Sequence, residues 1–163
     1  TGEVGEILAK GAQVMKGYWN REEATAKTVV DGWLHTGDAG YLDEEGYLFI
    51  KDRVKDLVIS GGENIYPAEI ENVLMAHPDI ADAAVIGVPD EQWGEVPLAV
   101  LVAGDSGEIS LEAMTEHCRV SLAGFKVPKH LRYVDMLPRN PSGKILKKEL
   151  RAAIVPEFDP QQA

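Results

Sequence analysis

The sequence predicts an α+β fold, in which a small domain of strands and helices follows a β-rich stretch. Three observations support this prediction. Residues 1–51 are patterned as short strands, residues 51–56 are nearly all charged, and the remainder alternates apolar strands with helix patterns. Because a charged, thinly apolar segment between two apolar regions marks a boundary, we expect two structural parts that meet there. The 163 residues, 45% of them hydrophobic, suffice for one core and part of another.

The first part reads as β structure. We expect a short strand at residues 5–11, a helical connection at 20–28, a strand near 32–38 and a hairpin over 40–50. The hairpin turn has the sequence DEEG, with Asp43 first and Gly46 last, which is typical of a type I turn.

Helix signals then follow. Pro67 stands at the first position of a helix predicted over residues 67–75, whose apolar residues fall on one face. Ser110 suits the N-cap of a second helix, whose apolar positions are Leu111, Met114, Cys118 and Leu122. A last helix is expected over 146–154, followed by a frayed tail at 156–163.

The strands of this second part are apolar runs bounded by turn residues. Residues 80–88 and 96–103 are predicted strands on either side of the turn-rich PDEQWGE, and residues 131–134 form a shorter one. Strands and helices in this mixture indicate a compact α+β domain of ordinary size.

Composition narrows the function classes. With Cys118 as the single cysteine, no internal disulfide forms, so we expect a reducing compartment and a cytoplasmic protein. No apolar run reaches the length of a membrane span, and the sequence contains no signal-peptide pattern. The chain starts without methionine, inside a predicted strand, so we expect a piece of a longer protein.

Charge is segregated along the chain. The net charge is −11, yet residues 125–151 hold eight Lys or Arg against Asp135 and Glu149. This arrangement indicates a local anionic ligand and argues against general attraction to nucleic acid or membranes. A solvated lysine-rich helix face would account for Lys147, Lys148 and Arg151, but not for Lys144, which follows a glycine in a predicted loop.

Three motifs in order resemble the C-terminal part of the adenylate-forming superfamily. They are contained in GWLHTGDAGYLDEEGYLFIKDRVKDLVISGGENIYPAEIE and PRNPSGKILKKEL. The SGGEN followed by YPAEIE is most similar to the fatty acyl-CoA synthetase branch. The resemblance implies activation of a carboxylic acid, a fatty acid in this branch, as acyl-AMP. ATP and Mg²⁺ would be used, and the acyl group would pass to CoA.

By the same resemblance, four residues serve adenylation and domain movement. Asp38 matches the carboxylate that accepts hydrogen bonds from both ribose hydroxyls, which suits its two acceptor oxygens. Arg53 matches an arginine whose planar donors contact the nucleotide. Lys55 matches the hinge about which the small domain rotates. Lys144 matches the lysine whose charge lowers repulsion between the attacking carboxylate and the α-phosphate.

The thioester step implies a second group of residues. Gly61 and Gly62 would let the backbone approach the pantetheine arm of CoA, and Trp93 would line its tunnel or else simply pack, half-exposed. Phe125, Lys126 and Lys129 resemble a segment that contacts the CoA nucleotide, although Val127 departs from the more basic versions. The histidines show no metal-ligand spacing, so no metal ligand is predicted: His35, His77, His117 and His130.

The resemblance also implies the domain organisation. Residues 1–51 would be a β-rich remnant of the large adenylation domain, 52–55 the hinge, 56–155 the mobile small domain and 156–163 a flexible tail. ATP and Mg²⁺ would be held mainly by upstream residues, so this piece alone should be inactive. Its incomplete strands would expose apolar edges, so we expect them to be disordered, packed back on the small domain, or paired with a second copy in a dimer. Two alternatives remain: a peptide-synthetase-type adenylation domain, and a non-catalytic module that binds CoA or nucleotide.

Overall fold

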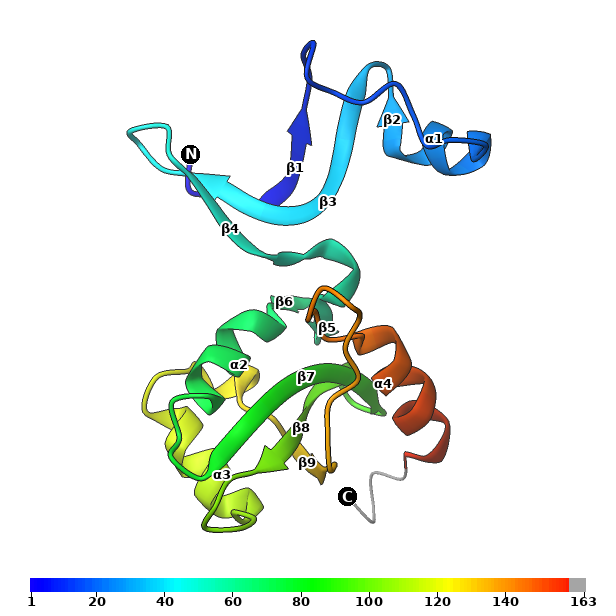
Figure 1. Ribbon diagram of the computed structural model, residues 1–163. Coiled ribbons are helices and arrows are strands. Elements are labelled where there is room, and N and C mark those ends of the chain that lie inside the picture. Colours follow the sequence, from blue (N-terminus) through cyan, green and yellow to red (C-terminus); the bar gives the residue numbers. More distant parts are fainter. Residues whose placement is uncertain (159–163) are drawn as a thin grey trace. The chain divides into compact units, whose positions relative to one another are not determined.

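The computed structural model describes residues 1–158, which divide into two compact units, Thr1–Lys55 and Asp56–Ala163 (Figure 1). Each unit has a sheet of its own. The arrangement of antiparallel and mixed sheets with helices confirms the predicted α+β class.

A long central strand organises the first unit. Strand β3 pairs antiparallel with the three other strands of its sheet, so that β1 lies along part of it and β2 and β4 along its two ends. Its elements are β1 (Gly5–Ala9), α1 (Glu22–Thr28), β2 (Val29–Val30), β3 (Trp33–Leu42) and β4 (Leu48–Arg53).

The predicted hairpin between β3 and β4 is confirmed. Asp43 Oδ1 accepts hydrogen bonds from the backbone N–H groups of Glu45 at 3.0 Å and Tyr47 at 2.8 Å. Gly46 has a φ of 86°, a left-handed conformation that glycine adopts without steric cost. An aspartate that opens the turn and a glycine that ends it therefore close this hairpin.

Almost nothing in the first unit is buried. Within Thr1–Lys55, Ala39 and Gly40 are the buried residues. The hairpin strands instead expose large apolar side chains: Leu42, Tyr47, Leu48, Phe49 and Ile50. A sheet without a covered apolar face has little stability of its own. Pairing of this face with a second copy of the chain stays a prediction.

The second unit is built on a sheet with the strand order β6-β5-β8-β7 and with β9 beside β8. Strand β9 runs parallel to β8, whereas the other pairs are antiparallel. The short helix η1 (Val54–Asp56) spans the boundary between the two units. The elements of the second unit are β5 (Val58–Ser60), β6 (Glu63–Ile65), α2 (Pro67–Leu74), β7 (Ile80–Asp90), β8 (Gly94–Ala103), α3 (Leu111–Arg119), η2 (Gly124–Lys126), β9 (His130–Tyr133), α4 (Lys147–Ile154) and η3 (Val155–Glu157).

Alternation along β7 and β8 divides the apolar core in two, because successive side chains of a strand point to opposite faces. Val85 and Leu101 pack in one cluster with residues of α2 and α3, including Ile70 and Met114. The residues that alternate with these along β7 and β8 point to the other face and pack in a second cluster with α4, for example Ile86 with Leu150 and Ile154. Figure 1 accordingly shows α2 and α3 on one side of the sheet and α4 on the other.

The helix starts follow the predicted signals. Pro67 occupies the first turn of α2, where its missing N–H costs nothing. Ser110 caps α3, since its Oγ accepts a hydrogen bond from Ala113 N at 3.2 Å. Cys118 lies on the buried face of α3, and this burial raises the pKa of its thiol to about 11. The thiol is therefore neutral at physiological pH.

Several element boundaries differ from the sequence prediction by a few residues, and two differences stand out. Strands β7 and β8 extend into the expected loop, because Asp90 still pairs with Gly94 across a tight turn. The predicted frayed tail is wrong for residues 156–158. Residues up to Glu157 form η3, and the Phe158 ring meets His130 edge-on with centroids 4.9 Å apart. Residues 159–163, the rest of that predicted tail, lie outside the described part.

Within residues 1–158, no helix combines the length and apolar character that a membrane span requires.

Candidate functional site

Asp38 and Arg53, the two residues predicted to bind nucleotide, lie side by side in the first unit. They are register partners on β3 and β4, and Arg53 Nε lies 2.8 Å from Asp38 Oδ1. Both side chains stay partly exposed, and an exposed pair of this kind contributes at most about 1 kcal/mol to stability. The pair is therefore dispensable for folding. It leaves the second carboxylate oxygen and the guanidinium NH₂ groups without hydrogen bonds within residues 1–158.

Glu6 on β1 holds the part of β3 that precedes Asp38, a role that the sequence does not announce. Its Oε1 accepts a hydrogen bond from Gly37 N at 3.1 Å, and its Oε2 lies 2.8 Å from His35 Nδ1. The hydrogen bond with His35 holds the pKa of the Glu6 carboxyl below its ordinary value. Only the pairing of β1 with β3 brings these residues together, and no local pattern in the sequence announces it.

Lys144 ends a tight turn in the second unit. Arg139 and Ile145 form an isolated antiparallel bridge, and Gly143, with a φ of 84°, allows the chain to reverse between them. The Lys144 side chain is exposed, and within residues 1–158 its Nζ makes no hydrogen bond or ion pair. This lysine is free to meet an anion.

The two glycines of the SGGEN segment have different surroundings. Both have positive φ, 58° at Gly61 and 87° at Gly62. A Cβ on Gly61 would lie 2.6 Å from Trp93 Cε3, whereas a Cβ on Gly62 would meet nothing within 4 Å. Gly61 N also donates a hydrogen bond to Trp93 O at 2.8 Å. Gly61 therefore makes room for the indole, and Gly62 is the glycine that is open to a ligand.

This difference predicts unequal effects of two matched substitutions. Gly61→Ala and Gly62→Ala should each lower the free energy of unfolding by about 1–2 kcal/mol, because left-handed backbone is strained for alanine. Gly61→Ala should lower the free energy of unfolding more than Gly62→Ala does, since the new methyl collides with the Trp93 ring. The same collision should shift the indole N–H resonance of Trp93 in NMR spectra of the 163-residue chain. A Trp93→Ala background should abolish the extra loss at Gly61. Equal losses and an unmoved indole signal in both variants would contradict the assignment.

Trp93 also contacts Lys129, so three of the residues predicted to meet CoA lie together. Lys129 Nζ lies 5.2 Å from the centroid of the Trp93 ring, within cation–π range. The backbone at Trp93 is fixed by Asp90, whose Oδ1 accepts from Trp93 N at 2.8 Å. That hydrogen bond lowers the pKa of the Asp90 carboxyl from its ordinary value. Gly61, Trp93 and Lys129 thus form one exposed cluster, called the tryptophan cluster below.

Lys126 is committed to an ion pair inside the unit. Its Nζ lies 2.8 and 2.7 Å from the two carboxylate oxygens of Glu69, at the start of α2. The same Nζ lies 5.8 Å from the centroid of the Phe125 ring. The Lys126 charge is therefore balanced locally, and Lys129 is the lysine of this segment that is left for an outside anion.

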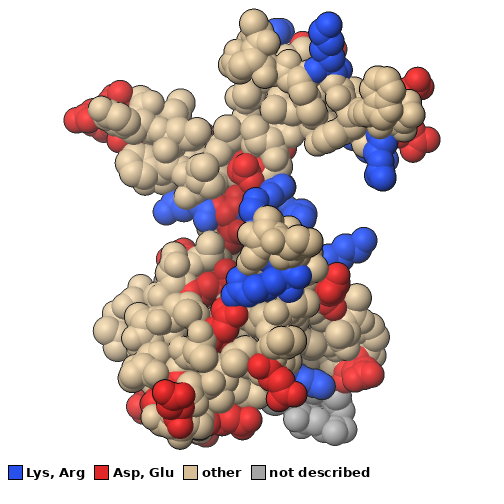
Figure 2. Space-filling model, in the orientation of Figure 1, with Lys and Arg blue, Asp and Glu red and all other residues tan. Residues whose placement is uncertain are grey.

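In the folded unit, nearby carboxylates partly neutralise the positive charge of the basic segment, residues 125–151. Of its eight Lys and Arg residues, four pair with carboxylates of the same unit. Figure 2 shows basic and acidic side chains side by side on the visible face of this unit. The solvated-helix interpretation is wrong for Lys147, whose side chain is 10% exposed and lies 2.8 Å from Glu71. It is also wrong for Arg151, which binds Asp56.

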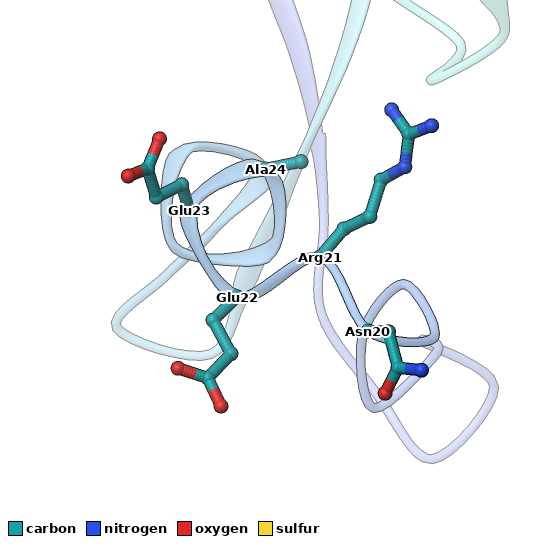
Figure 3. Close-up of a pocket in the computed structure, with 5 residues that line it drawn as sticks. All are labelled: Asn20, Arg21, Glu22, Glu23 and Ala24. Atoms are coloured by element: carbon teal, nitrogen blue, oxygen red, sulfur yellow. The ribbon is translucent and has the colours of Figure 1, made fainter.

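A surface hollow of about 560 Å³ at the start of α1 contains none of the predicted residues. Asn20, Arg21, Glu22, Glu23 and Ala24 line it. Figure 3 shows their polar side chains turned in different directions. The four polar residues are exposed and do not converge on a common point, so this hollow carries no site.

Metal ligands do not gather in the described residues. Within residues 1–158, no group of three or more His, Cys, Asp or Glu could hold a metal ion.

Residues 69–144 match the family described as the AMP-binding enzyme C-terminal domain. The chain is 54% identical over 150 residues to a 2-succinylbenzoate–CoA ligase of Bacillus cereus. The chain carries an AMP-binding C-terminal domain. The predicted resemblance to the acyl-CoA synthetase branch of the adenylate-forming superfamily is thereby confirmed.

Solved structures of related enzymes resemble the chain closely. An o-succinylbenzoate CoA synthetase from Bacillus subtilis, in complex with the acyl-adenylate intermediate, is 50% identical over 92% of this chain, with a TM-score of 0.86. The same enzyme has been solved with ATP and a magnesium ion. A fatty acyl CoA synthetase from Mycobacterium tuberculosis is 48% identical over 96% of the chain, with a TM-score of 0.68.

The chain spans 31% of the length of the Bacillus cereus ligase and 31% of each of these solved structures, the ATP complex included. The AMP-binding C-terminal domain match includes Trp93, Phe125, Lys126, Lys129 and Lys144. The other predicted residues precede it in the chain: Asp38, Arg53, Lys55, Gly61 and Gly62.

Lys55, the predicted hinge, is the last residue of the first unit, and the match over residues 69–144 lies within the second unit. It lies in the short helix η1 with an exposed side chain. The next residue, Asp56, is buried, and its Oδ1 lies 3.0 Å from Arg151 Nη1, while its carbonyl accepts from Nη2 at 3.2 Å. These contacts attach Asp56, the first residue of the second unit, to helix α4.

Proposed function

We propose that this chain is the C-terminal part of an ATP-dependent acid–CoA ligase. The carboxylate of the acid attacks the α-phosphorus of ATP, the bond to pyrophosphate breaks, and acyl-AMP forms. The CoA sulfur then attacks the acyl carbon, the thiol proton is released, and AMP leaves. The observation that carries the proposal is the 54% identity to a CoA ligase over 92% of the chain.

In this proposal Lys144 acts in the first step. Its ammonium group reduces the repulsion between the carboxylate and the α-phosphate as they approach, and it stabilises the charge of the transition state. The exposure of Lys144 and its lack of a partner within residues 1–158 support this role. Asp38 and Arg53 would meet the ribose and phosphate oxygens of the nucleotide, in keeping with their exposed, paired placement.

The second step is assigned to the tryptophan cluster and Gly62. Because a Cβ on Gly62 would meet nothing within 4 Å, a pantetheine arm can approach its backbone closely. Lys129 offers a positive charge to the CoA phosphates, since its Nζ lies over the exposed Trp93 ring and interacts only at longer range with the Asp90 carboxylate. Lys126 and Phe125 would contribute surface, with the Lys126 charge already held by Glu69.

The identity of the carboxylic acid substrate is a separate part of the proposal. The predicted fatty acid has support from the relative in Mycobacterium tuberculosis, named a fatty acyl CoA synthetase. The curated relatives, however, are named for 2-succinylbenzoate, and their identity to the chain is higher. We therefore propose 2-succinylbenzoate as the first acid to test and a fatty acid as the second.

The deciding experiment supplies the longer enzyme with ATP, CoA and either acid. AMP, pyrophosphate and the acyl-CoA should form together. Turnover with a pantetheinylated carrier protein in place of CoA would favour the peptide-synthetase alternative. Binding of CoA or nucleotide without any pyrophosphate release would favour the non-catalytic module. The 163-residue chain alone should show no ATP–pyrophosphate exchange.

The hinge assignment predicts that Lys55→Pro separates the two half-reactions. Proline fixes φ near −65°, so a hinge whose torsions must change between steps should be held in one orientation. One half-reaction should fall at least about tenfold while the other stays near wild type. Pyrophosphate release and thioester formation from supplied acyl-adenylate measure the two.

Lys55→Ala is the matched control, because it removes the side chain but leaves the torsions free. It should leave both half-reactions close to wild type. Equal losses in Lys55→Pro, or none, would place the hinge at another residue.

A further inference from the structure

The turn that carries Lys144 is closed by its own polar groups. Asn140 Oδ1 accepts hydrogen bonds from Ser142 N at 3.1 Å, Ser142 Oγ at 2.8 Å and Lys144 N at 2.9 Å. In the backbone, Asn140 N donates to Lys144 O, and Gly143 N donates to Asn140 O, both at 2.9 Å. These bonds fix the shape of the turn, but they do not attach it to the rest of the unit.

Apolar contacts attach the base of the turn and leave the tip without them. Leu137 is buried in the cluster beneath α4, and Ile145 packs against the same cluster. Leu146 N donates to Pro138 O at 2.8 Å, which closes the base. Residues 141–144 at the tip are all exposed. Something other than burial must hold the tip in place.

Arg139 provides that connection through two donors of one guanidinium. Its Nη1 donates to Gly143 O at the tip, and its Nη2 donates to Asp82 Oδ2 on β7, each at 2.6 Å. Asp82 is itself fixed, because its Oδ1 accepts from Ala83 N at 3.0 Å. A planar guanidinium can bridge two acceptors in a defined geometry, which a lysine ammonium on a flexible stem does poorly.

We propose that Asp82 and Arg139 are positioning residues for Lys144. The carboxylate of Asp82 fixes the Arg139 guanidinium, which holds Gly143 O and thereby the tip from which Lys144 projects. Their function is to keep the Lys144 ammonium within reach of the reacting oxygens, without touching ATP or the acid themselves. This role rests on the proposed function of Lys144 in adenylation.

The first test follows the turn itself and needs no activity. Asp82→Asn keeps the shape of the side chain but removes its charge. In the 163-residue chain, ¹⁵N relaxation should show the order parameters of Gly143 and Lys144 falling from about 0.85 to below about 0.6. Arg132→Lys is the control, because Arg132 is exposed in the same basic segment and pairs with no carboxylate within residues 1–158. Unchanged order parameters in Asp82→Asn would overturn the proposal.

The second test separates positioning from general stability. In the longer enzyme, Asp82→Asn and Arg139→Ala should slow adenylation about 10- to 100-fold, since a misplacement near 1 Å has that effect. Thioester formation from supplied acyl-adenylate should be unchanged. Arg139→Lys should recover little of the loss, because a lysine can still reach Asp82 but does not also hold Gly143 O.

Two outcomes distinguish failure of the inference from failure of the proposed function. If both half-reactions fall equally, the ion pair is structural and the positioning role is overturned. If the wild-type enzyme makes no acyl-adenylate, the proposed function fails, and with it the role of Lys144. A fall in the order parameters would still show that Asp82 and Arg139 hold the turn.

Discussion

Replacing Lys144 with alanine in the longer enzyme should slow acyl-adenylate formation by about 10²–10³-fold, the usual effect of removing one charge-stabilising contact. Thioester formation from supplied acyl-adenylate should remain near wild type, because the second step does not bring two anionic oxygens together. The Lys144 side chain is exposed and makes no hydrogen bond or ion pair within residues 1–158, so its removal should not alter the fold. Pyrophosphate release and thioester formation, assayed separately, measure the two steps.

Lys148→Ala is the matched control for this prediction. Lys148 is also an exposed lysine, in the first turn of α4, and it has no ion pair within residues 1–158. Its loss should leave both steps unchanged. A Lys144→Ala enzyme in which both steps decline together would assign this residue a structural role, contrary to its exposure.

Replacing Arg151 with methionine should lower the unfolding free energy of the second unit by about 3 kcal/mol, the order expected when a buried ion pair loses one partner. Asp56 is 8% exposed, and Arg151 supplies hydrogen bonds to both its carboxylate and its carbonyl oxygen. The substitution leaves this carboxylate desolvated without a cation. Urea unfolding of the 163-residue chain, followed by circular dichroism, measures the loss.

Two further variants make this stability prediction sharp. Arg119→Met changes an exposed arginine at the end of α3 that pairs with no carboxylate within residues 1–158, and it should alter stability by less than about 0.5 kcal/mol. Adding Asp56→Asn to Arg151→Met should recover part of the loss, because the unpaired charge is then gone. If Arg151→Met matches Arg119→Met, the ion pair contributes nothing to folding.

Local signals predicted much of the fold. Pro67 and Ser110 mark helix starts by the chemistry of a first turn, and Asp43 with Gly46 marks a hairpin by turn chemistry. The apolar runs that became β7 and β8 were also visible, but their ends were not, because strand pairing continues through residues chosen for a turn.

The partners of the basic residues were beyond local reasoning. Lys126 pairs with a glutamate 57 residues away, and Arg151 with an aspartate 95 residues away. Such contacts exist only once the sheet has brought α2, α4 and η1 together. For the same reason, the sequence shows two equivalent glycines in SGGEN, whereas the structure separates them by the position of Trp93.

Two ion pairs fix helix α4 to the rest of the second unit. Near its start Lys147 Nζ binds Glu71 Oε1, which also accepts a hydrogen bond from Val85 N on the edge of β7. One turn later Arg151 forms an ion pair with Asp56, the residue next to the predicted hinge. Because these ion pairs join α4 to α2 and to Asp56, we expect α4 to move with the second unit as one body when the torsions of residues 52–55 change.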